Sequence, residues 1–274
     1  MILNCVPKFD SVTEYSSRWN GEIMDYIREK GVSIESLLKD DAVRSKVEAA
    51  LQEHPGEAFV FYDHGDKDCL VGNDRTPVID LRNVGLLRDR IVYTLACLSA
   101  KILGYEAHRR GCKTYWGYTE VFAFTSDALD EFKESANIGL KLWADDGFKS
   151  HWNVYLEGAK QRFTELVDQL LEEGKPFAAM IMRRNRDVLV CYNGAEPEKP
   201  CVFRRMAVKL FGKRAWFIPR RMFASIALFF GGWLGALHAL AHMFWEKGGI
   251  PEILAPQGDY LLYACMMIGY LLLP

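Results

Sequence analysis

Two reactive side chains follow two short hydrophobic runs of this sequence. His64 comes two residues after the run 59–62, and Cys97 comes two residues after the run 91–95. Short runs rich in aromatic and β-branched side chains are typical of buried strands. If these strands are parallel neighbours, their carboxyl ends meet at one edge of a sheet, where open α/β folds bind ligands. A thiol beside an imidazole would then supply a nucleophile and a base for acyl transfer.

The segment from residue 57 to residue 124 resembles the caspase-like cysteine peptidases, the broad group that includes caspases, gingipains, separases and CHAT peptidases. The resemblance rests on His64-Gly65 and Ala96-Cys97, each at the end of a hydrophobic run and in this order. It continues through a helix to a Gly-Tyr passage, as in the gingipain and CHAT branches: Thr114-Tyr115-Trp116-Gly117-Tyr118. The resemblance implies a caspase-like, mostly parallel α/β sheet and cysteine peptidase activity.

The resemblance also implies a role for each residue of the pair. Cys97 would attack the scissile carbonyl carbon, and His64 would protonate the leaving amine and later activate water. The backbone N–H groups of Gly65 and Cys97 would form the oxyanion hole. In caspase-like enzymes the two side chains flank the substrate and need not touch. The sequence shows no third member of a triad.

The sequence around Cys97 predicts a helix that begins directly after the thiol. The residues Leu98-Ser99-Ala100 lead into a helical pattern. A helix N-terminus has free N–H groups and a positive dipole end, both of which favour a thiolate. We therefore expect a lowered pKa for Cys97.

The substrate preference of such a site depends on the charge of its pocket. Among the enzymes that the chain resembles, gingipains and separases prefer basic residues and caspases prefer acidic ones. Four acidic side chains near the strand ends are candidates for binding a basic substrate residue: Asp66, Asp68, Glu120 and Asp127. The sequence does not choose among them, and the expected partner is a protein or peptide substrate.

The composition is that of an ordinary globular protein. Of the 274 residues, 50% are hydrophobic and 26% charged, and the net charge of −2 gives no reason to expect nucleic acid binding. The seven cysteines include no C-x-x-C pair, which argues against zinc and fits reduced, cytosolic thiols. We expect no metal and no cofactor. We interpret four other cysteines as structural thiols: Cys5, Cys69, Cys112 and Cys191.

The other histidines of this part of the chain are not expected at the site. We interpret His54 and His108 as surface residues and His151 as a helix-end residue.

The elements around the pair alternate between strands and helices, which predicts a mostly parallel sheet with helices on both faces. A polar loop between residues 65 and 90 should contain a short strand near 78–80 and a helical turn near 86–87. The segment 177–184 fits either a helix or a strand. The other expected strands are 2–6, 113–118 with 121–124, and 187–194, and the other expected helices are 12–31, 33–51, 129–143 and 155–170.

The composition changes near residue 200. Seven basic residues between 204 and 221 are interleaved with aromatic side chains, and residues 222–245 then contain no Asp, Glu, Lys or Arg. A helix of these 24 residues, at about 1.5 Å per residue, would cross the roughly 30 Å hydrocarbon core of a bilayer. The second apolar run, 260–273, has 14 residues and is short for a span.

These features predict three parts of the chain: a caspase-like peptidase domain over 1–205, a basic juxtamembrane linker over 206–221 and a membrane segment over 222–274. The basic residues before the span predict that the peptidase domain lies on the cytoplasmic side of the membrane, and no signal peptide is evident. Gly231 and Gly235 form a G-x-x-x-G pair, which would allow close contact between membrane helices and hence a homo-oligomer.

The sequence as a whole predicts a membrane-anchored cysteine endopeptidase with a Cys-His dyad. Two alternatives stay open. The caspase-like domain could be a non-catalytic sensor or scaffold whose membrane segment is the effector. The chain could also be a transamidase that passes the acyl group to an amine, although the membrane-anchored transamidases of this group act on the lumenal side.

Overall fold

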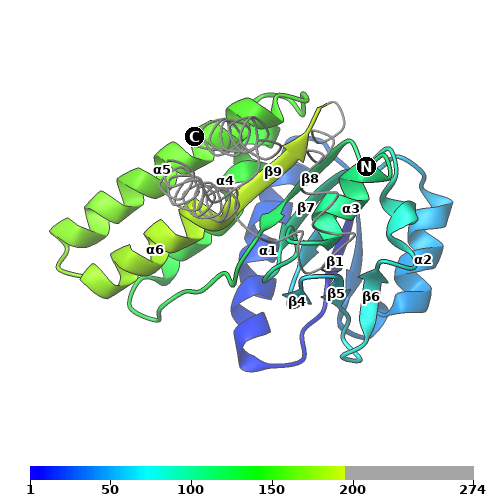
Figure 1. Cartoon of the computed structure of the whole chain (residues 1–274), viewed down its shortest axis with the longest axis horizontal. Helices are drawn as coiled ribbons and strands as arrows, with labels where there is room; N and C mark the ends of the chain where they lie inside the picture. The colour runs from blue at the N-terminus through cyan, green and yellow to red at the C-terminus, as the bar shows by residue number, and fades with distance from the viewer. Residues whose placement is uncertain (195–274) are drawn as a thin grey trace, which may run out of the picture. The chain divides into compact units, whose positions relative to one another are not determined.

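A six-stranded sheet lies at the centre of the structure (Figure 1). The structure is a computed structural model, and it describes residues 1–194. The first five strands in spatial order run parallel, and the sixth is antiparallel to its neighbour. The mostly parallel α/β sheet predicted from the sequence is therefore confirmed. The spatial order is β2 (Ile34–Leu38), β1 (Ile2–Val6), β3 (Ala58–Tyr62), β7 (Ile91–Leu95), β8 (Thr114–Tyr118) and β9 (Leu189–Asn193).

Helices cover both faces of this sheet, because successive side chains of a strand point to opposite faces. In β3, Val60 and Tyr62 belong to a hydrophobic cluster with four helices: α1 (Ser11–Glu29), α4 (Leu129–Asp145), α5 (Trp152–Glu172) and α6 (Pro176–Val188). Phe59 and Phe61 belong to a second cluster, with two shorter helices: α2 (Arg44–Glu53) and α3 (Leu103–Arg109). The aromatic side chains expected in the core are found there, as Trp19 of α1 shows with only 1% of its surface exposed.

Helix α1 begins at the carboxyl edge of the sheet, where Asp10 caps it. The Asp10 side chain accepts hydrogen bonds from the backbone N–H groups of Val12 and Thr13, and the Thr13 hydroxyl accepts one from the Asp10 N–H. This capping box satisfies donors that a helix start leaves unpaired. Farther along α1, the Asn20 side-chain amide exchanges two buried hydrogen bonds with that of Asn4 in β1, at 2.8 and 2.9 Å. The helix start is thus held in place beside the strand ends.

The chain between β3 and β7 forms a small antiparallel sheet and a 3-10 turn. The strands are β4 (Gly65–Asp66), β5 (Cys69–Val71) and β6 (Pro77–Asp80), and the turn is η2 (Val84–Leu87). The predicted short strand near residues 78–80 and turn near 86–87 are confirmed.

Two of the predicted elements are wrong. The segment 33–51 is not one helix, because Ile34–Leu38 forms strand β2 along the edge of β1 and α2 begins only at Arg44. Pairing with a distant strand here outweighs the local helical spacing. Residues 121–124 are not a strand, because the place beside β8 is taken by β9, so the chain leaves the sheet after Tyr118. The ambiguous segment 177–184 lies in α6. The other predicted strands, and the helices predicted over 12–31, 129–143 and 155–170, are confirmed.

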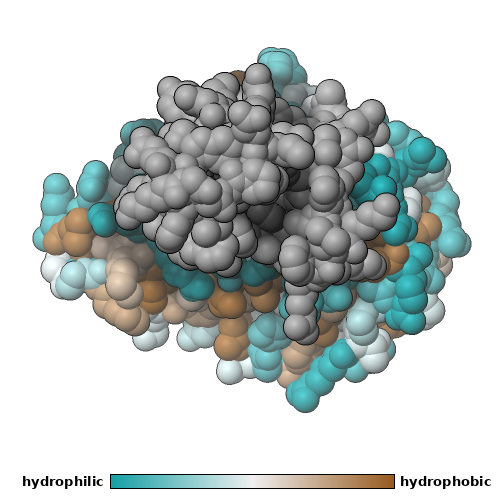
Figure 2. Space-filling view, viewed as in Figure 1, coloured by the Kyte–Doolittle hydropathy of each residue, from teal (hydrophilic) through white to brown (hydrophobic). Residues whose placement is uncertain are grey.

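Figure 2 shows the surface of the face seen in Figure 1. Hydrophobic surface appears at the left, where Figure 1 places α5 and α6, and exposed side chains on these helices include Val154, Phe177 and Met180. Among residues 1–194, no helix combines the length and the apolar character that crossing a membrane requires. The predicted linker 206–221 and the predicted spans 222–245 and 260–273 lie outside the described residues.

Candidate active site

The ends of β3 and β7 bring His64 and Cys97 to the same edge of the sheet. The two strands are parallel neighbours, with Tyr62 paired with Leu95. The pairing continues one residue beyond β3, because the Asp63 N–H donates to the Leu95 carbonyl oxygen at 3.2 Å. The parallel arrangement on which the sequence interpretation depended is therefore present.

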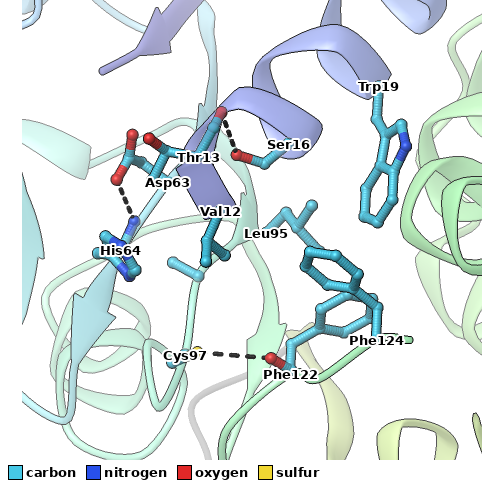
Figure 3. Close-up of a pocket in the computed structure, with 11 residues that line it drawn as sticks. Val12, Thr13, Ser16, Trp19, Asp63, His64, Leu95, Cys97, Phe122 and Phe124 are labelled. Carbon is cyan, nitrogen blue, oxygen red and sulfur yellow. Dashed lines mark hydrogen bonds between the residues drawn. The ribbon is translucent and has the colours of Figure 1, made fainter. Parts of the chain in front are cut away.

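His64 and Cys97 line one small pocket of about 70 Å³ (Figure 3). The first turns of α1 form one wall, and the segment after β8 forms another with Phe122 and Phe124. Leu95 and Ala96, at the end of β7, complete it. A thiol and an imidazole thus line one pocket.

Gly65 allows the two strand ends to approach closely. A Cβ atom at this position would lie 2.9 Å from the Cys97 carbonyl oxygen and 3.0 Å from the Ala96 Cβ. Real Cβ atoms do not come so close to a backbone oxygen, so any larger residue would push the two segments apart. Gly65 is therefore next to the Cys97 backbone, as a shared oxyanion hole requires.

The predicted helix at Cys97 is wrong. Leu98 has a φ of 59°, in the left-handed region, and residues 97–102 form turns, so that α3 begins only at Leu103. A leucine in this conformation costs about 1–2 kcal/mol, which the Leu98 N–H bond to the Glu120 carbonyl oxygen helps to offset. The thiol consequently lacks the helix dipole that was expected to activate it.

The structure gives Cys97 a raised pKa rather than a lowered one. Burial has the largest effect, and it outweighs the thiol's hydrogen bond to the Phe122 carbonyl oxygen, at 3.7 Å, and the nearby positive charge of Arg184. Figure 3 shows the sulfur directed toward Phe122. In this state the nucleophile is a protonated thiol.

The segment that contacts the thiol is itself fastened to α6. Asn185, which is fully buried, donates to the Ala123 carbonyl oxygen at 2.6 Å and accepts from the Ala123 N–H at 3.1 Å. Arg184 of the same helix donates to the Val121 carbonyl oxygen at 3.4 Å. Helix α6 thus sets the position of the Phe122 wall relative to Cys97.

Asp10 is a site residue that the sequence interpretation missed. Its Oδ2 lies 2.7 Å from Nε2 of His64, and the two residues are 54 positions apart in the chain. Partial burial acts to raise the pKa of Asp10, but hydrogen bonds from the Thr13 N–H and from His64 outweigh it and lower the pKa. The available signal was the position of Asp10 after β1, since β1 lies beside β3 and their ends share one edge.

Asp63 is a second residue that the sequence did not identify, although it precedes His64 directly. Only 6% of its surface is exposed, Oδ1 accepts a hydrogen bond from the His64 N–H, and Oδ2 is buried without a hydrogen-bond partner. Burial raises the pKa of this carboxyl to about 7, against the opposing effect of the His64 N–H. The site therefore contains a carboxyl group whose pKa is raised toward neutral pH.

None of the four acidic candidates for substrate binding lines the pocket. The Asp66 carboxylate accepts from the Lys67 N–H, and Glu120 forms an ion pair with Lys101 at 2.9 Å. Asp127 is exposed, and Asp68 precedes β5 on the small antiparallel sheet. The structure thus brings His64, Gly65 and Cys97 together and leaves these four carboxylates outside.

Two of the three other histidines within residues 1–194 lie where the sequence predicted, and one does not. His151 caps the start of α5, as predicted for a helix-end residue, and His54 is partly exposed beside Glu35. His108 is not a surface residue, because 94% of it is buried and its Nδ1 contacts the Cys112 carbonyl oxygen at 3.0 Å. Five cysteines lie within residues 1–194, and all five are free thiols. Residues 1–194 contain no cluster of three or more His, Cys, Asp or Glu side chains that could hold a metal ion.

Comparisons of the chain with protein-family models, with curated proteins and with solved structures find no match. The geometry of the site and the residues that carry the caspase-like resemblance are therefore the basis for the function proposed below.

Proposed function

We propose that this protein is a caspase-like cysteine endopeptidase, anchored to a membrane by residues 222–245, with its peptidase domain on the cytoplasmic side. The observation that supports the enzymatic part best is the shared pocket at the ends of β3 and β7, into which both His64 and Cys97 open. Two reactive groups at the carboxyl edge of a parallel sheet lie where α/β folds carry out chemistry.

In the proposed reaction, His64 acts with Asp10 as an orienting partner. The Nε2–H of His64 donates to the Asp10 carboxylate, which leaves Nδ1 as the nitrogen that exchanges a proton with the reacting groups. Nδ1 takes the proton from the Cys97 thiol as the sulfur forms a bond to the scissile carbonyl carbon. The backbone N–H groups of Gly65 and Cys97 donate to the carbonyl oxygen as it becomes negative.

The second half of the reaction returns the proton. The C–N bond breaks as the imidazolium of His64 protonates the leaving amine, and a thioester to Cys97 remains. Water then gives a proton to His64 as its oxygen forms a bond to the acyl carbon. The C–S bond breaks and the acid leaves, and His64 returns the proton to the sulfur, which restores the thiol. Because the described state holds a protonated thiol bonded to the Phe122 carbonyl oxygen, proton removal by His64 is part of the first step.

A reactive peptide probe tests the enzymatic proposal. A peptide bearing a thiol-reactive group at the scissile position should modify Cys97 in the full chain, as identified by peptide mass mapping. Cys69 is the matched control, because it is also a partly exposed thiol whose pKa burial raises. A small alkylating reagent should modify both thiols, whereas the peptide probe should modify only Cys97. Equal modification of both by the peptide probe would contradict a substrate site at Cys97.

The same experiment separates the alternatives. A non-catalytic sensor or scaffold would show no turnover of any peptide that depends on Cys97. A transamidase would transfer the acyl group to an added amine in preference to water, which the masses of the products reveal. We favour hydrolysis because His64 is partly exposed, so that water can reach it.

Membrane anchoring has its own test. The full chain should require detergent for extraction, because residues 222–245 have no formal charge and each Lys or Arg at a bilayer centre costs about 2.5–3.5 kcal/mol on insertion scales. In sealed vesicles, a Gly249→Cys variant should be labelled from the side opposite the peptidase domain. Labelling from the cytoplasmic side alone would overturn the orientation, and recovery of the chain in the soluble fraction would overturn the anchoring.

A further inference from the structure

The pocket lined by His64 and Cys97 has mainly apolar walls. Its apolar lining comes from α1, from the end of β7 and from the segment after β8, and consists of Val12, Trp19, Leu95, Ala96, Phe122 and Phe124. Figure 3 shows the side chains of Leu95, Phe122 and Phe124 between α1 and Cys97. A substrate side chain that enters this space loses its contact with water and gains contact with hydrocarbon.

The two hydroxyl groups that line the pocket, those of Thr13 and Ser16, have hydrogen-bond partners within the protein. The Thr13 hydroxyl donates to the Asp10 carbonyl oxygen, and the Ser16 hydroxyl donates to the Thr13 carbonyl oxygen, each at 3.0 Å. Among the described residues, no Lys or Arg lines the pocket. Arg184, whose positive charge acts on Cys97, is outside the lining and donates to the Val121 carbonyl oxygen. An acidic substrate side chain would therefore be buried in the pocket without a direct ion-pair partner, which is unfavourable.

Asp63 does not make the pocket suitable for a basic side chain. Its Oδ1 is bonded to the His64 N–H, and its Oδ2 is buried, so neither oxygen is presented to an incoming cation. The raised pKa of Asp63 acts in the same direction, because half of the carboxyl groups carry no charge near pH 7.

The size of the pocket further limits which substrate side chains it can accept. Its volume of about 70 Å³ is roughly half of the 150 Å³ cavity that accepts a benzene molecule. An aromatic side chain or an extended arginine would project out of this space, whereas a side chain of one to three carbon atoms fits within it.

We propose that this pocket selects the substrate residue that precedes the scissile bond, and that it accepts a small aliphatic side chain such as alanine or valine. The inference rests on the proposed peptidase function and adds a substrate class to it. It differs from the basic and acidic preferences that the caspase-like resemblance implied.

A series of fluorogenic peptides that differ only in the residue before the scissile bond tests the inference on the full chain in detergent. The series contains Ala, Val, Leu, Phe, Lys, Arg and Asp at that position. We expect kcat/KM for Ala or Val to exceed that for Lys, Arg, Asp and Phe by about 10–200-fold, the discrimination that small differences in apolar fit provide. Highest turnover with Lys, Arg, Asp or Phe would overturn the inference.

A charge placed at the rim provides a second, independent test. Val12 is 49% exposed in the first turn of α1, where an acidic residue suits the helix dipole, so Val12→Asp should fold. This variant should raise kcat/KM for the Lys and Arg peptides about tenfold and lower it for the Val peptide. Val154→Asp is the matched control, because Val154 is 68% exposed in the first turn of α5 and does not line the pocket.

The controls distinguish a failure of this inference from a failure of the proposed function. Turnover that Cys97→Ala abolishes but that is best with a charged or aromatic residue would leave the peptidase proposal standing and refute the substrate class. No Cys97-dependent turnover with any peptide would refute the peptidase proposal and this inference with it. An unchanged preference in Val12→Asp would show that the pocket does not hold the selected side chain.

Discussion

Two sets of residues in this protein contain the same three side-chain types, Cys, His and Asp, but differ in hydrogen bonding and in access to a pocket. The site group lies at the carboxyl edge of β3 and β7 and consists of Cys97, His64 and Asp63. The layer group lies outside the pocket and consists of His108 in α3, Cys112 just after α3 and Asp80 at the end of β6.

The thiol and the carboxylate of the layer group have their polar atoms paired. The Cys112 thiol has the Thr114 and Arg90 carbonyl oxygens at 3.0 and 3.3 Å, and burial raises its pKa to about 12. The Asp80 carboxylate contacts Arg82 and Arg44 at 2.5 and 2.9 Å, and these hydrogen bonds hold its pKa well below the usual range. Such a group is stable and chemically inert.

The site group leaves its polar atoms available or unpaired. Asp63 has an oxygen without a partner, Cys97 has one long hydrogen bond, and His64 has one nitrogen bound to Asp10. Unpaired groups lower stability, and proteins concentrate them where chemistry takes place. Residue type alone therefore does not identify a reactive site, whereas the degree of pairing and access to a pocket do.

The largest expected effect comes from removing the two thiols in turn. Cys97→Ala should reduce kcat/KM by more than about 10³-fold, because no other group in the pocket can form the thioester. Cys112→Ala should leave kcat/KM unchanged, because Cys112 is 2% exposed and lies outside the pocket. Steady-state kinetics on a cleaved peptide measures both. Wild-type turnover in Cys97→Ala would remove the distinction between the two groups.

Alanine substitutions at the three histidines should differ almost as much in their effect on kcat. His64→Ala should lower kcat by about 10²–10⁴-fold, the usual contribution of a general acid–base group. His151→Ala should have little effect, because that side chain is 58% exposed and remote from the pocket. His108→Ala should lower the melting temperature without lowering kcat, because it breaks a buried contact to Cys112. Comparable losses of kcat in all three variants would argue against His64 as the base.

Asparagine substitutions at the two buried carboxyl groups, Asp63 and Asp80, should change stability relative to the wild type with opposite pH dependence. The pKa of Asp63 is raised by burial to about 7, so its protonated form stabilises the fold below about pH 4, and this stabilisation is lost as pH rises toward 7. Asp63→Asn should therefore gain stability relative to the wild type by up to about 1.4 kcal/mol per pH unit over that range. The pKa of Asp80 is lowered, so Asp80→Asn should lose relative stability as pH rises from acid to above 4. Denaturant unfolding of the full chain in detergent measures the Asp63 slope between pH 4 and 7 and the Asp80 slope below pH 4. Slopes of the same sign would contradict the assignment.

The smallest expected effect concerns the two His–Asp pairs. Asp10→Asn keeps an oxygen that can cap α1 but removes the charge beside His64, so kcat should fall by about tenfold and the pH profile of kcat should shift. Asp146→Asn is the matched control, because Asp146 pairs in the same way with His151, at 2.9 Å, away from the pocket. A lower melting temperature with an unchanged pH profile in Asp10→Asn would assign Asp10 a structural role only.

Local patterns determined much of the fold and the main pair of the site. The hydrophobic runs that become β1, β3, β7 and β8 predicted buried strands, and their alternation with helical patterns predicted a mostly parallel sheet. His64 and Cys97 were identifiable because each follows such a run, and parallel strands end at the same edge. The predicted strands, and the placement of both side chains at one edge of the sheet, depend on neighbours in the sequence, and the structure confirms them.

Only the tertiary structure decided the features that depend on distant residues. Strand β2 exists because Ile34–Leu38 pairs with β1, although its spacing also fits a helix. Asp10 reaches His64 across 54 residues because β1 and β3 are neighbours, and the left-handed Leu98 keeps α3 away from Cys97. The pKa values of Asp63 and Cys97 follow from burial, which is created by residues from α1 and the segment after β8. Spacing and propensity describe a residue's local neighbours, whereas pairing, burial and charge environment are set by which distant segments pack together.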